Sequence, residues 1–272
     1  MLSHGLSLVD HGGQGSPLIL LHGFLGSGDD WLSVLPELKN KYHCYTIDLP
    51  GHGSSGGFSD EISAEADAFA GISDRVHRLL SEEGLLPATV MGYSLGGRIA
   101  LGFASHYPDD VELLILEGAN PGLKTERERQ ERIDSDSRWS QRFRAEPLKD
   151  VLKDWYRQPV FSSLTEEQRN KLVKQRSIDN DGSLLADAMD LLSLGRQSDW
   201  WHVSSQLTCN VVYIVGERDN KFLAIAEALK KEAFKKNGKV CKAVVADAGH
   251  NAHRDNPKDF LVSLFSAECL KG

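Results

Sequence analysis

The stretch Val90-Met91-Gly92-Tyr93-Ser94-Leu95-Gly96-Gly97-Arg98 decides the fold, because it places a G-x-S-x-G motif between an apolar run and a helical pattern. In this context the serine lies on a strained turn from strand to helix, which holds its Oγ clear of the sheet. The glycines two residues before and after it let the backbone segments approach each other without side-chain clashes. The motif therefore predicts a nucleophile elbow at Ser94.

Outside this motif, short apolar runs bounded by Gly, Pro and Asp alternate with longer amphipathic stretches. That alternation is typical of an α/β protein, with a mostly parallel sheet covered by helices. We predict strands at residues 18–22, 44–48, 89–92, 112–117, 211–216 and 240–246. We predict helices at residues 64–83, 95–106, 223–236 and 259–267.

The connection between the fourth and fifth predicted strands breaks this alternation. About ninety residues there show helical periodicity and no convincing strand, which is far more than a crossover loop needs. Residues 119–200 hold 10 of the 15 arginines, with 5 lysines and 15 acidic residues, and are neutral. We therefore expect a core of residues 1–118 and 201–272 with a helical lid inserted at 119–200. The arginines fit solvated i,i+4 ion pairs, and a few of them can also face inward.

The composition argues against several classes of function. With 272 residues, 40% hydrophobic and 26% charged, the chain can bury a substantial core. The net charge of −8 argues against nonspecific nucleic-acid binding, so an anionic ligand would need a local basic cluster. No apolar run approaches a membrane span and the N-terminus lacks a signal-peptide pattern. We expect a cytoplasmic protein without a membrane partner.

The four cysteines, Cys44, Cys209, Cys241 and Cys269, form no CxxC pair and have no spacing typical of a metal site. We expect four reduced thiols, with neither a zinc site nor a disulfide framework. No cross-link or metal ion is therefore expected to support the fold.

A serine hydroxyl needs an imidazole partner, and a carboxylate to orient that imidazole, before it can act as nucleophile or base at neutral pH. In a fold with this elbow the residues follow the chain order serine, acid, histidine. His250 fits best because it follows the last predicted strand; His253 is the alternative, which we expect on the surface or beside the substrate. Asp219 follows the preceding strand and is the preferred acid, with Glu217 as the less favoured choice.

An oxyanion beside the serine would be held by two backbone N–H groups. One comes from the residue after the nucleophile, and the other from the loop after the first predicted strand. Leu95 and Phe24 are the candidates. His22 and His52 lie in loops at the same predicted edge of the sheet, and we expect them to form structural hydrogen bonds.

Five motifs occur in order along the chain: HGF at 22–24, DLPGHGSS at 48–55, GYSLGG at 92–97, GERD at 216–219 and AGH at 248–250. Through them the chain resembles the α/β-hydrolase superfamily over essentially its whole length, and 119–200 corresponds to the helical lid of that superfamily. Four further segments are more specific: LEGANPGL at 116–123, SRWSQRF at 137–143, EPLKDVLKDWYRQPVFSSL at 146–164 and AGHNAHRDNP at 248–257. Together they resemble the 2-succinyl-6-hydroxy-2,4-cyclohexadiene-1-carboxylate synthase family of menaquinone biosynthesis.

The resemblance implies a carbon–oxygen lyase rather than an ester hydrolase. That family eliminates pyruvate from 2-succinyl-5-enolpyruvyl-6-hydroxy-3-cyclohexene-1-carboxylate, beginning with removal of a proton next to the succinyl ketone. Ser94, activated by His250 and Asp219, would be the base, and the amides of Phe24 and Leu95 would stabilise the developing oxyanion. The reaction implies no metal and no organic cofactor.

The substrate that the resemblance implies is a small anion with three carboxylates, which guanidinium groups bind bidentately. Arg98 lies one turn into the predicted elbow helix and can reach the site. Arg132, Arg176, Tyr93 and Trp155 match positions of the family's substrate-binding residues. For Arg132 and Arg176 a surface ion pair is the alternative.

Two other functions stay open at the level of sequence. The same triad would serve a carboxylester or thioester hydrolase that works by acyl transfer. A noncatalytic binding protein of this fold is a further hypothesis, although an intact set of Ser94, Asp219 and His250 argues against it. A dehalogenase of this fold would need an aspartate in place of Ser94. The basic stretch 230–242 is longer than we expect for the family, and we predict a solvated helix end and turn there.

Overall fold

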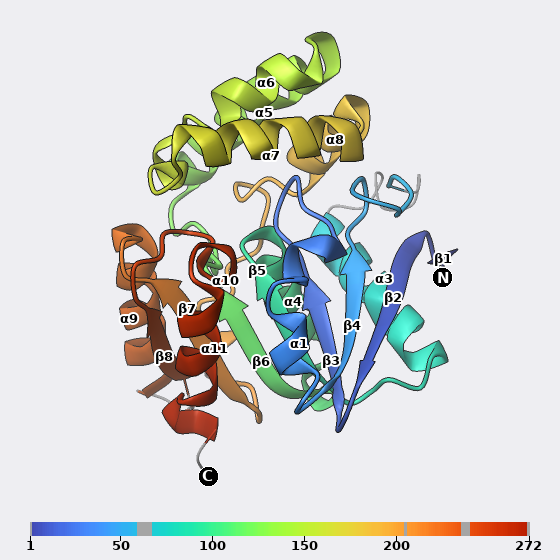
Figure 1. The fold of residues 1–272 in the computed structure, drawn as a ribbon, viewed down its shortest axis with the longest axis vertical. Helices are drawn as coiled ribbons and strands as arrows, with labels where there is room; N and C mark the ends of the chain where they lie inside the picture. Colours follow the sequence, from blue (N-terminus) through green and yellow to red (C-terminus); the bar gives the residue numbers. More distant parts are fainter. Residues whose placement is uncertain (1, 59–66, 204–205, 235–239, 271–272) are drawn as a thin grey trace.

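The computed structural model describes residues 2–58, 67–203, 206–234 and 240–270 of the chain. At its centre is an eight-stranded sheet in the order β1-β2-β4-β3-β5-β6-β7-β8 (Figure 1). The strands are β1 (Leu2–Ser3), β2 (Leu6–Gly13), β3 (Pro17–Leu21), β4 (His43–Asp48), β5 (Ala88–Tyr93), β6 (Val111–Glu117), β7 (Asn210–Gly216) and β8 (Val240–Val245). Strands β3 to β8 run parallel, whereas β2 is antiparallel to β1 and β4.

The six predicted strands are confirmed, each to within one residue at either end. The sequence does not predict β1 and β2. Strand β1 has only two residues, and β2 is buried only over its first three residues and shifts register between Asp10 and Gly12. These strands therefore lack the continuous apolar run that marks the buried parallel strands.

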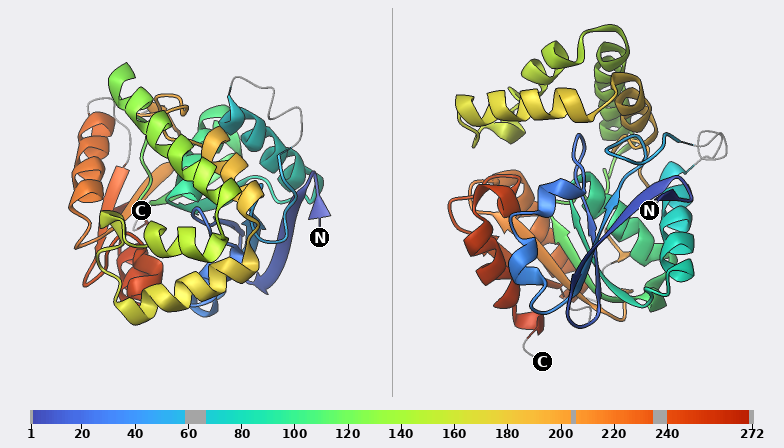
Figure 2. Two further views of the ribbon diagram at one scale, coloured as in Figure 1. Left: turned by 90° about the horizontal axis from the view of Figure 1, so that it is seen from above. Right: turned by 45° about the vertical axis from the view of Figure 1, so that its right-hand side comes forward.

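Helices cover both faces of the sheet (Figure 2). On one face pack α3 (Ala68–Glu82), α4 (Leu95–His106) and α9 (Asn220–Phe234), and on the other α1 (Leu35–Leu38) and α11 (Pro257–Phe265). The short helix α10 (Ala252–Asp255) and the 3-10 turns η1 (Gly28–Trp31), η2 (Pro108–Asp110), η3 (Pro159–Phe161) and η5 (Glu268–Leu270) complete these elements. No helix in the described part of the chain is both long and apolar enough to span a membrane.

The predicted helix 95–106 is confirmed to the residue as α4. Helix α11 begins and ends two residues before the predicted 259–267, because the Asn256 side chain accepts from the N–H of Asp259 and Pro257 fits the first turn. Helix α9 begins three residues before its prediction. Residues 64–66 and 235–236 of two predicted helices, and the centre of the turn predicted in 230–242, lie outside the described residues.

Residues 119–200, all of them described, contain four longer helices and no strand: α5 (Glu126–Ala145), α6 (Leu148–Trp155), α7 (Glu166–Asp179) and α8 (Gly182–Leu191). These helices lie over the carboxyl ends of the parallel strands (Figures 1 and 2). Capping boxes at Thr125 and Thr165 begin α5 and α7. A separate apolar cluster, which includes Phe143, Leu152 and Leu172, packs these helices against Leu25 of the core.

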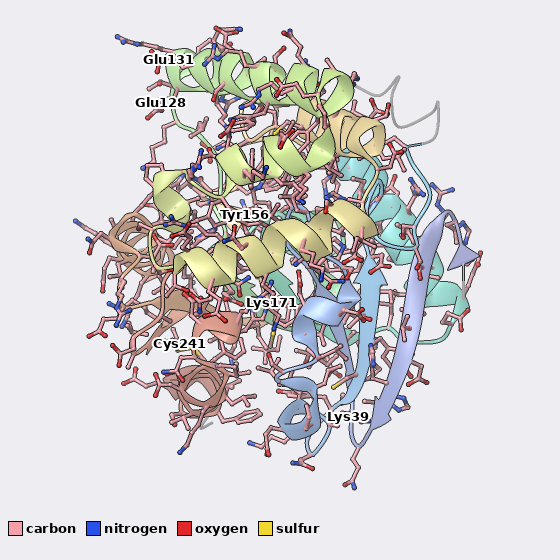
Figure 3. All side chains as sticks on the ribbon, turned by 45° about the horizontal axis from the view of Figure 1, so that its top comes forward. Lys39, Glu128, Glu131, Tyr156, Lys171 and Cys241 are labelled. Carbon is pink, nitrogen blue, oxygen red and sulfur yellow. A yellow bond between two sulfur atoms is a disulfide. The ribbon has the colours of Figure 1, made fainter. Side chains whose placement is uncertain are left out.

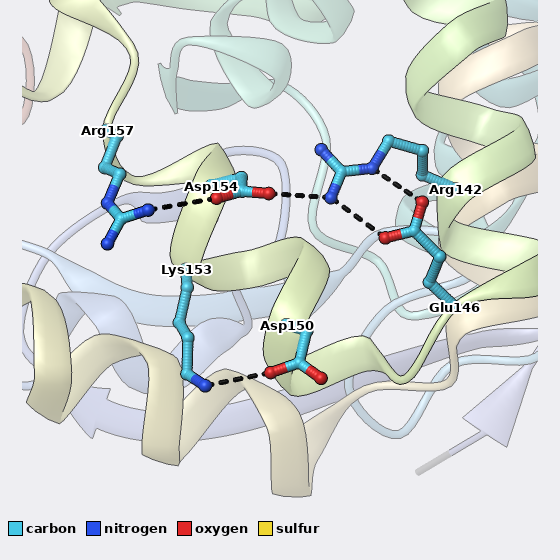
Figure 4. Close-up of polar contacts among 6 residues, drawn as sticks. All are labelled: Arg142, Glu146, Asp150, Lys153, Asp154 and Arg157. Atoms are coloured by element: carbon cyan, nitrogen blue, oxygen red, sulfur yellow. Dashed lines mark hydrogen bonds and ion pairs between the residues drawn. The ribbon is translucent and has the colours of Figure 1, made fainter.

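Charged residues on the outer side of this helical segment form ion pairs. The Arg142 guanidinium binds the carboxylates of both Glu146 and Asp154 (Figure 4). Figure 3 shows Glu128 and Glu131 on the outer side of α5. The predicted solvated i,i+4 pairs are confirmed for Arg127–Glu131 and Arg142–Glu146; Arg132 and Asp136 also pair at this spacing, but the Asp136 carboxylate is buried. Exposed pairs of this kind contribute about 0.3–0.5 kcal/mol each, so the packing of the apolar cluster holds the segment together more than they do.

A disulfide joins Cys241 in β8 to Cys269 in η5, with Cα atoms 5.9 Å apart. The expectation of reduced thiols is therefore wrong for these two residues, whereas Cys44 and Cys209 are free. Sequence spacing carried no signal for this pair, because α11 brings the end of the chain back beside β8 and the two cysteines are 28 residues apart.

Candidate active site

Ser94 occupies a strained turn between β5 and α4. Its backbone has φ 50° and ψ −105°, a region that residues with a side chain rarely adopt. The N–H of Ser94 donates to the carbonyl oxygen of Glu117 over 2.8 Å. A Cβ on Gly92 would overlap the backbone of Gly96, and a Cβ on Gly96 would overlap that of Leu21. Glycines at these positions therefore let the elbow form.

His250 connects Ser94 to Asp219. Its Nε2 lies 3.2 Å from the Oγ of Ser94, and its Nδ1 lies 2.7 Å from Oδ2 of Asp219. The side chains of His250 and Asp219 are only 8% and 10% exposed, which shields their hydrogen bond from water. With Nδ1–H donating to the carboxylate, Nε2 can accept the proton of Ser94. The structure thus brings the three predicted triad residues into hydrogen-bonding order.

The surroundings of the triad fix its histidine and its acid. Oδ1 of Asp219 accepts from the N–H of Phe222 over 3.3 Å at the start of α9, where the helix dipole favours a negative charge. The Phe222 ring lies 4.5 Å from that of His250. Gly118 has φ 55°, and a Cβ there would lie 2.9 Å from Cε1 of His250. The imidazole is thus closely packed on two sides.

The alternative triad residues lie elsewhere. Glu217 is exposed and accepts from the backbone N–H of Asp247 over 3.1 Å. His253 is fully buried and binds Glu117, with 2.6 Å between Nδ1 and Oε2. The expectation that His253 lies on the surface or beside the substrate is therefore wrong. The sequence missed this burial because it does not show that β6 ends against α10.

The loop after β3 is held by two buried histidines. The Nδ1–H of His22 donates to the carbonyl oxygen of Gly23 over 2.8 Å, and its Nε2 accepts from the N–H of Leu49 over 2.9 Å. His52 lies 3.0 Å from the carbonyl oxygen of Pro50, and its burial, together with nearby His22, lowers its pKa to about 3. Both rings therefore serve the loops, as the sequence predicts.

The two candidate oxyanion donors line the same cavity as Ser94. Leu95 is the first residue of α4, so its N–H has no acceptor within the helix. Among the described residues, the N–H of Phe24 has no hydrogen-bond acceptor. Both groups are therefore available to an oxyanion.

A cavity of about 340 Å³ lies between the core and the helical segment 119–200. Its wall includes every predicted site residue except the triad acid. These residues are Ser94, His250, Phe24, Tyr93, Leu95, Arg98, Arg132, Trp155 and Arg176. Asp219 lies behind His250 and is not part of the wall. The structure therefore gathers residues from both segments around one space.

Five cationic and three acidic side chains line this cavity, so its wall has a net positive charge in a chain of net charge −8: Arg98, Arg132, Arg176, Lys221 and Arg254 against Asp30, Asp136 and Asp255. The local basic cluster that an anionic ligand needs is present. Lys221 and Arg254 were not predicted, although Arg254 lies in the segment 248–257 that carries the resemblance.

Arg98 differs from the other three arginines of this cavity, each of which has a carboxylate partner. Its Nη1 donates to the carbonyl oxygen of Leu192 over 3.0 Å and to Oε1 of Gln197 over 3.3 Å. Among the described residues, no carboxylate lies within ion-pair distance of its guanidinium. Burial, with a smaller effect of nearby Arg132, lowers the pKa of Arg98 to about 9. A bound carboxylate would supply the missing counter-charge.

Arg132 and Arg176 both bind acidic side chains, but at the cavity wall rather than at the outer surface. The Nε–H of Arg132 donates to both carboxylate oxygens of Asp136, at 2.8 and 2.7 Å, and Asp136 is only 5% exposed. Arg176 binds the buried carboxylate of Asp30, and Nη1 of Arg254 lies 3.7 Å from the same group. Neither arginine therefore forms the surface ion pair that was the alternative, because both partner carboxylates are buried.

Aromatic side chains form another part of the wall. The ring of Trp155 lies 5.2 Å from Phe24 and 5.0 Å from Trp139. Tyr93 packs 5.4 Å from His250, and burial raises its pKa well above the ordinary value, so it stays protonated. Trp139 and Tyr156 were not predicted individually, although both lie in segments that carry the resemblance. In Figure 3, Tyr156 lies at the end of α6, facing α7.

The described residues contain no group of three or more His, Cys, Asp or Glu side chains that could hold a metal ion.

The fold and the elbow define a protein of the α/β-hydrolase class, and the model of the alpha/beta hydrolase fold family matches residues 16–257. The chain is 40% identical over 265 residues to the 2-succinyl-6-hydroxy-2,4-cyclohexadiene-1-carboxylate synthase of Yersinia pseudotuberculosis serotype O:3 (strain YPIII), covering 96% of this chain and 91% of that protein. The identity and both coverages are the same for the synthase of Yersinia pestis (strain Pestoides F). The chain belongs to the family of these synthases within the α/β-hydrolase fold.

Solved structures agree with this assignment. MenH from S. aureus has a TM-score of 0.85 at 25% identity, over 95% of this chain and 96% of that one. An esterase from Exiguobacterium antarcticum has a TM-score of 0.77 at 20% identity, over 96% and 94%, and shows the shared fold alone. The fold class and the family that the sequence motifs predict are both confirmed.

Proposed function

We propose that this chain is a carbon–oxygen lyase that converts 2-succinyl-5-enolpyruvyl-6-hydroxy-3-cyclohexene-1-carboxylate to 2-succinyl-6-hydroxy-2,4-cyclohexadiene-1-carboxylate and pyruvate. Its curated relatives have the name of the synthase that makes this product. The observation that carries the proposal is the position of Ser94 and His250 in a cavity with a cationic wall. A site for a simple apolar ester has no need of five cations.

In the proposed reaction, His250 removes the proton of Ser94 Oγ as this oxygen takes the proton next to the succinyl ketone. Negative charge then develops on the ketone oxygen, where the N–H groups of Phe24 and Leu95 stabilise it. The electrons of the broken C–H bond form a new ring double bond, the existing double bond shifts by one position, and the C–O bond to the enolpyruvyl group breaks. The departing enolate takes the proton from His250 and becomes pyruvate, so the elimination balances.

Asp219 supports both proton transfers. Its carboxylate is 2.7 Å from Nδ1 of His250 and stabilises the imidazolium between the two steps. The cations hold the three carboxylates of the substrate, which places the acidic C–H beside Ser94. Because Tyr93 stays protonated and packs on His250, its role in this scheme is to position the imidazole.

The competing function is a carboxylester or thioester hydrolase, because the same triad could attack a carbonyl carbon. The decisive experiment incubates the purified chain with the enolpyruvyl substrate and with a panel of activated esters. We expect pyruvate release from the former and no acyl adduct on Ser94 by mass spectrometry. An acyl adduct together with no pyruvate would establish the hydrolase instead.

Two variants complete this experiment. Ser94→Ala should abolish pyruvate release, because it removes the base, whereas Ser162→Ala changes an exposed serine outside the cavity and should have no effect. Unchanged function of Ser94→Ala in vivo, in a protein that releases no pyruvate in vitro, would favour a noncatalytic binding protein.

A further inference from the structure

A second pair of histidine and carboxylate lies directly behind the triad. Glu117 ends β6, and His253 lies in α10, three residues after His250. Their side chains are only 1% and 0% exposed. Oε2 of Glu117 is 2.6 Å from Nδ1 of His253, and Oε1 accepts from the backbone N–H of His253 over 3.1 Å. Both carboxylate oxygens therefore hold the segment that follows His250.

The backbone of Glu117 contacts the other half of the catalytic machinery. Its carbonyl oxygen accepts from the N–H of Ser94 over 2.8 Å and so closes the elbow. The next residue, Gly118, leaves the space that the His250 ring occupies, since a Cβ there would lie 2.9 Å from Cε1. The two residues Glu117 and Gly118, at the end of β6 and just after it, thus contact the nucleophile turn, the catalytic imidazole and the loop that carries it.

Rings pack tightly around His253 on its other sides. Trp31 stacks on it with 4.2 Å between ring centroids, and Tyr93 and Phe260 meet it edge-on at 5.3 and 5.9 Å. Tyr93 also lies 5.4 Å from His250, so it spans the space between the two histidines. Within the described residues, Nε2 of His253 has no hydrogen-bond partner, which leaves Glu117 as the polar anchor of this ring.

A carboxylate buried to this degree is costly unless it is paired, and an apolar pair of similar size would fill the space at lower cost. A polar pair specifies one geometry where apolar packing allows several. Here the geometry concerns three segments that are distant in sequence. Glu117 lies 23 residues after Ser94 and 136 residues before His253, and it forms hydrogen bonds with both.

We propose that Glu117 and His253 form a positioning pair that sets the distance between the Ser94 Oγ and the His250 Nε2. The pair does not touch the substrate, since neither residue lines the cavity. It acts by tying the His250 loop to the strand whose carbonyl closes the elbow. The readout in pyruvate release rests on the proposed lyase function, whereas the effect on Ser94 reactivity does not.

The test is Glu117→Gln. The amide keeps the size of the side chain, but its NH2 group faces one of the two N–H donors that now bind the carboxylate. We expect kcat for pyruvate release to fall about tenfold or more, since misplacement of reacting groups by about 1 Å can cost 10²-fold, while KM stays within about twofold. Glu112→Gln, an exposed glutamate on the same strand, is the matched control and should behave as the wild type.

The rate at which a fluorophosphonate labels Ser94 gives a second readout that needs no lyase substrate. We expect Glu117→Gln to slow labelling by a factor similar to the fall in kcat, at a temperature well below its unfolding midpoint. If the wild type releases no pyruvate but Glu117→Gln is still labelled more slowly than the wild type, the proposed function is overturned and the positioning pair is supported. Unchanged labelling and unchanged kcat in folded Glu117→Gln would overturn the positioning pair alone.

Two variants of the partner keep the proposal testable if Glu117→Gln does not fold. In His253→Asn, the side-chain N–H can take the place of the Nδ1–H donor, whereas His253→Phe keeps the ring and removes the donor. We expect His253→Asn to retain most of the labelling rate and His253→Phe to lose about tenfold. Equal labelling rates in the two variants, at equal unfolding midpoints, would overturn the assignment.

Discussion

Arg98→Gln removes the one cavity arginine that has no carboxylate partner among the described residues. In the wild type, a substrate carboxylate would form a charge-assisted hydrogen bond with this guanidinium, worth about 1.5–3 kcal/mol. Its loss corresponds to a decrease of about 10- to 150-fold in kcat/KM. Because the carboxylate is bound alike before and during the elimination, the change should appear mainly in KM.

The pKa of Arg98 makes this prediction specific. Burial and the neighbouring Arg132 lower that pKa, so the free protein disfavours the unpaired charge that a substrate carboxylate would neutralise. A guanidinium stays protonated across the pH range in which the triad works, so Arg98→Gln should lower kcat/KM by a similar factor throughout that range.

The effect on stability has the opposite sign. The lowered pKa means that the folded state disfavours the charged form of Arg98, so at pH 7 the charge lowers the free energy of unfolding. Arg98→Gln should therefore leave the unfolding midpoint unchanged or raise it. The assays are pyruvate release across pH and thermal unfolding at pH 7, with exposed Arg127→Gln as the control. A kcat/KM within twofold of the wild type, or a loss that varies strongly with pH, would refute this reasoning.

Three further predictions concern the triad and the buried ion pairs. Asp219→Asn should lower kcat by about 10⁴-fold with little change in KM, because the amide no longer stabilises the imidazolium of His250; steady-state pyruvate release checks this, and a fall below tenfold would contradict it. Gly118→Ala adds a Cβ 2.9 Å from the His250 ring at φ 55°, so it should lower both kcat and the unfolding midpoint; unchanged values of both would show that the loop adapts. Asp30→Asn leaves Arg176 buried without its carboxylate and should lower the free energy of unfolding by about 3 kcal/mol at pH 7. Burial raises the pKa of Asp30, but Arg176 lowers it overall, so the stability from this pair is complete above the unfolded pKa near 4 and is lost as the pH falls below it. Urea unfolding of Asp30→Asn should therefore lose part of the acid dependence of the wild type, and equal dependence would contradict the argument.

The parallel part of the fold could be predicted from the sequence because each buried strand is a continuous apolar run with a turn signal at its end. The edge strands β1 and β2 could not, since β2 is half exposed and its register is set by pairing with β4. The disulfide between Cys241 and Cys269 depends on how α11 returns the chain to the sheet, which local patterns do not record.

The candidate site divides in the same way. The places of Ser94, Asp219 and His250 follow from their positions at strand ends, which parallel strands bring to one edge. The partners of the arginines do not, because Asp30 meets Arg176 across 146 residues of sequence. His253 shows the limit most directly: its burial depends on Glu117, a residue that the sequence marks only as the end of a strand.

The three arginines predicted to bind substrate do not offer an anion equal gain. At Arg132 and Arg176 an incoming carboxylate must share the guanidinium with Asp136 or Asp30, whereas at Arg98 it neutralises an uncompensated charge. Charges farther away than about 8 Å are largely screened at physiological salt, so the net charge of −8 has little influence inside the cavity. The side chains of the wall decide the local potential, and among its arginines Arg98 is the one without a carboxylate partner in the described residues. Binding of a multiply charged anion should therefore depend on Arg98 first, with the two paired arginines determining its orientation.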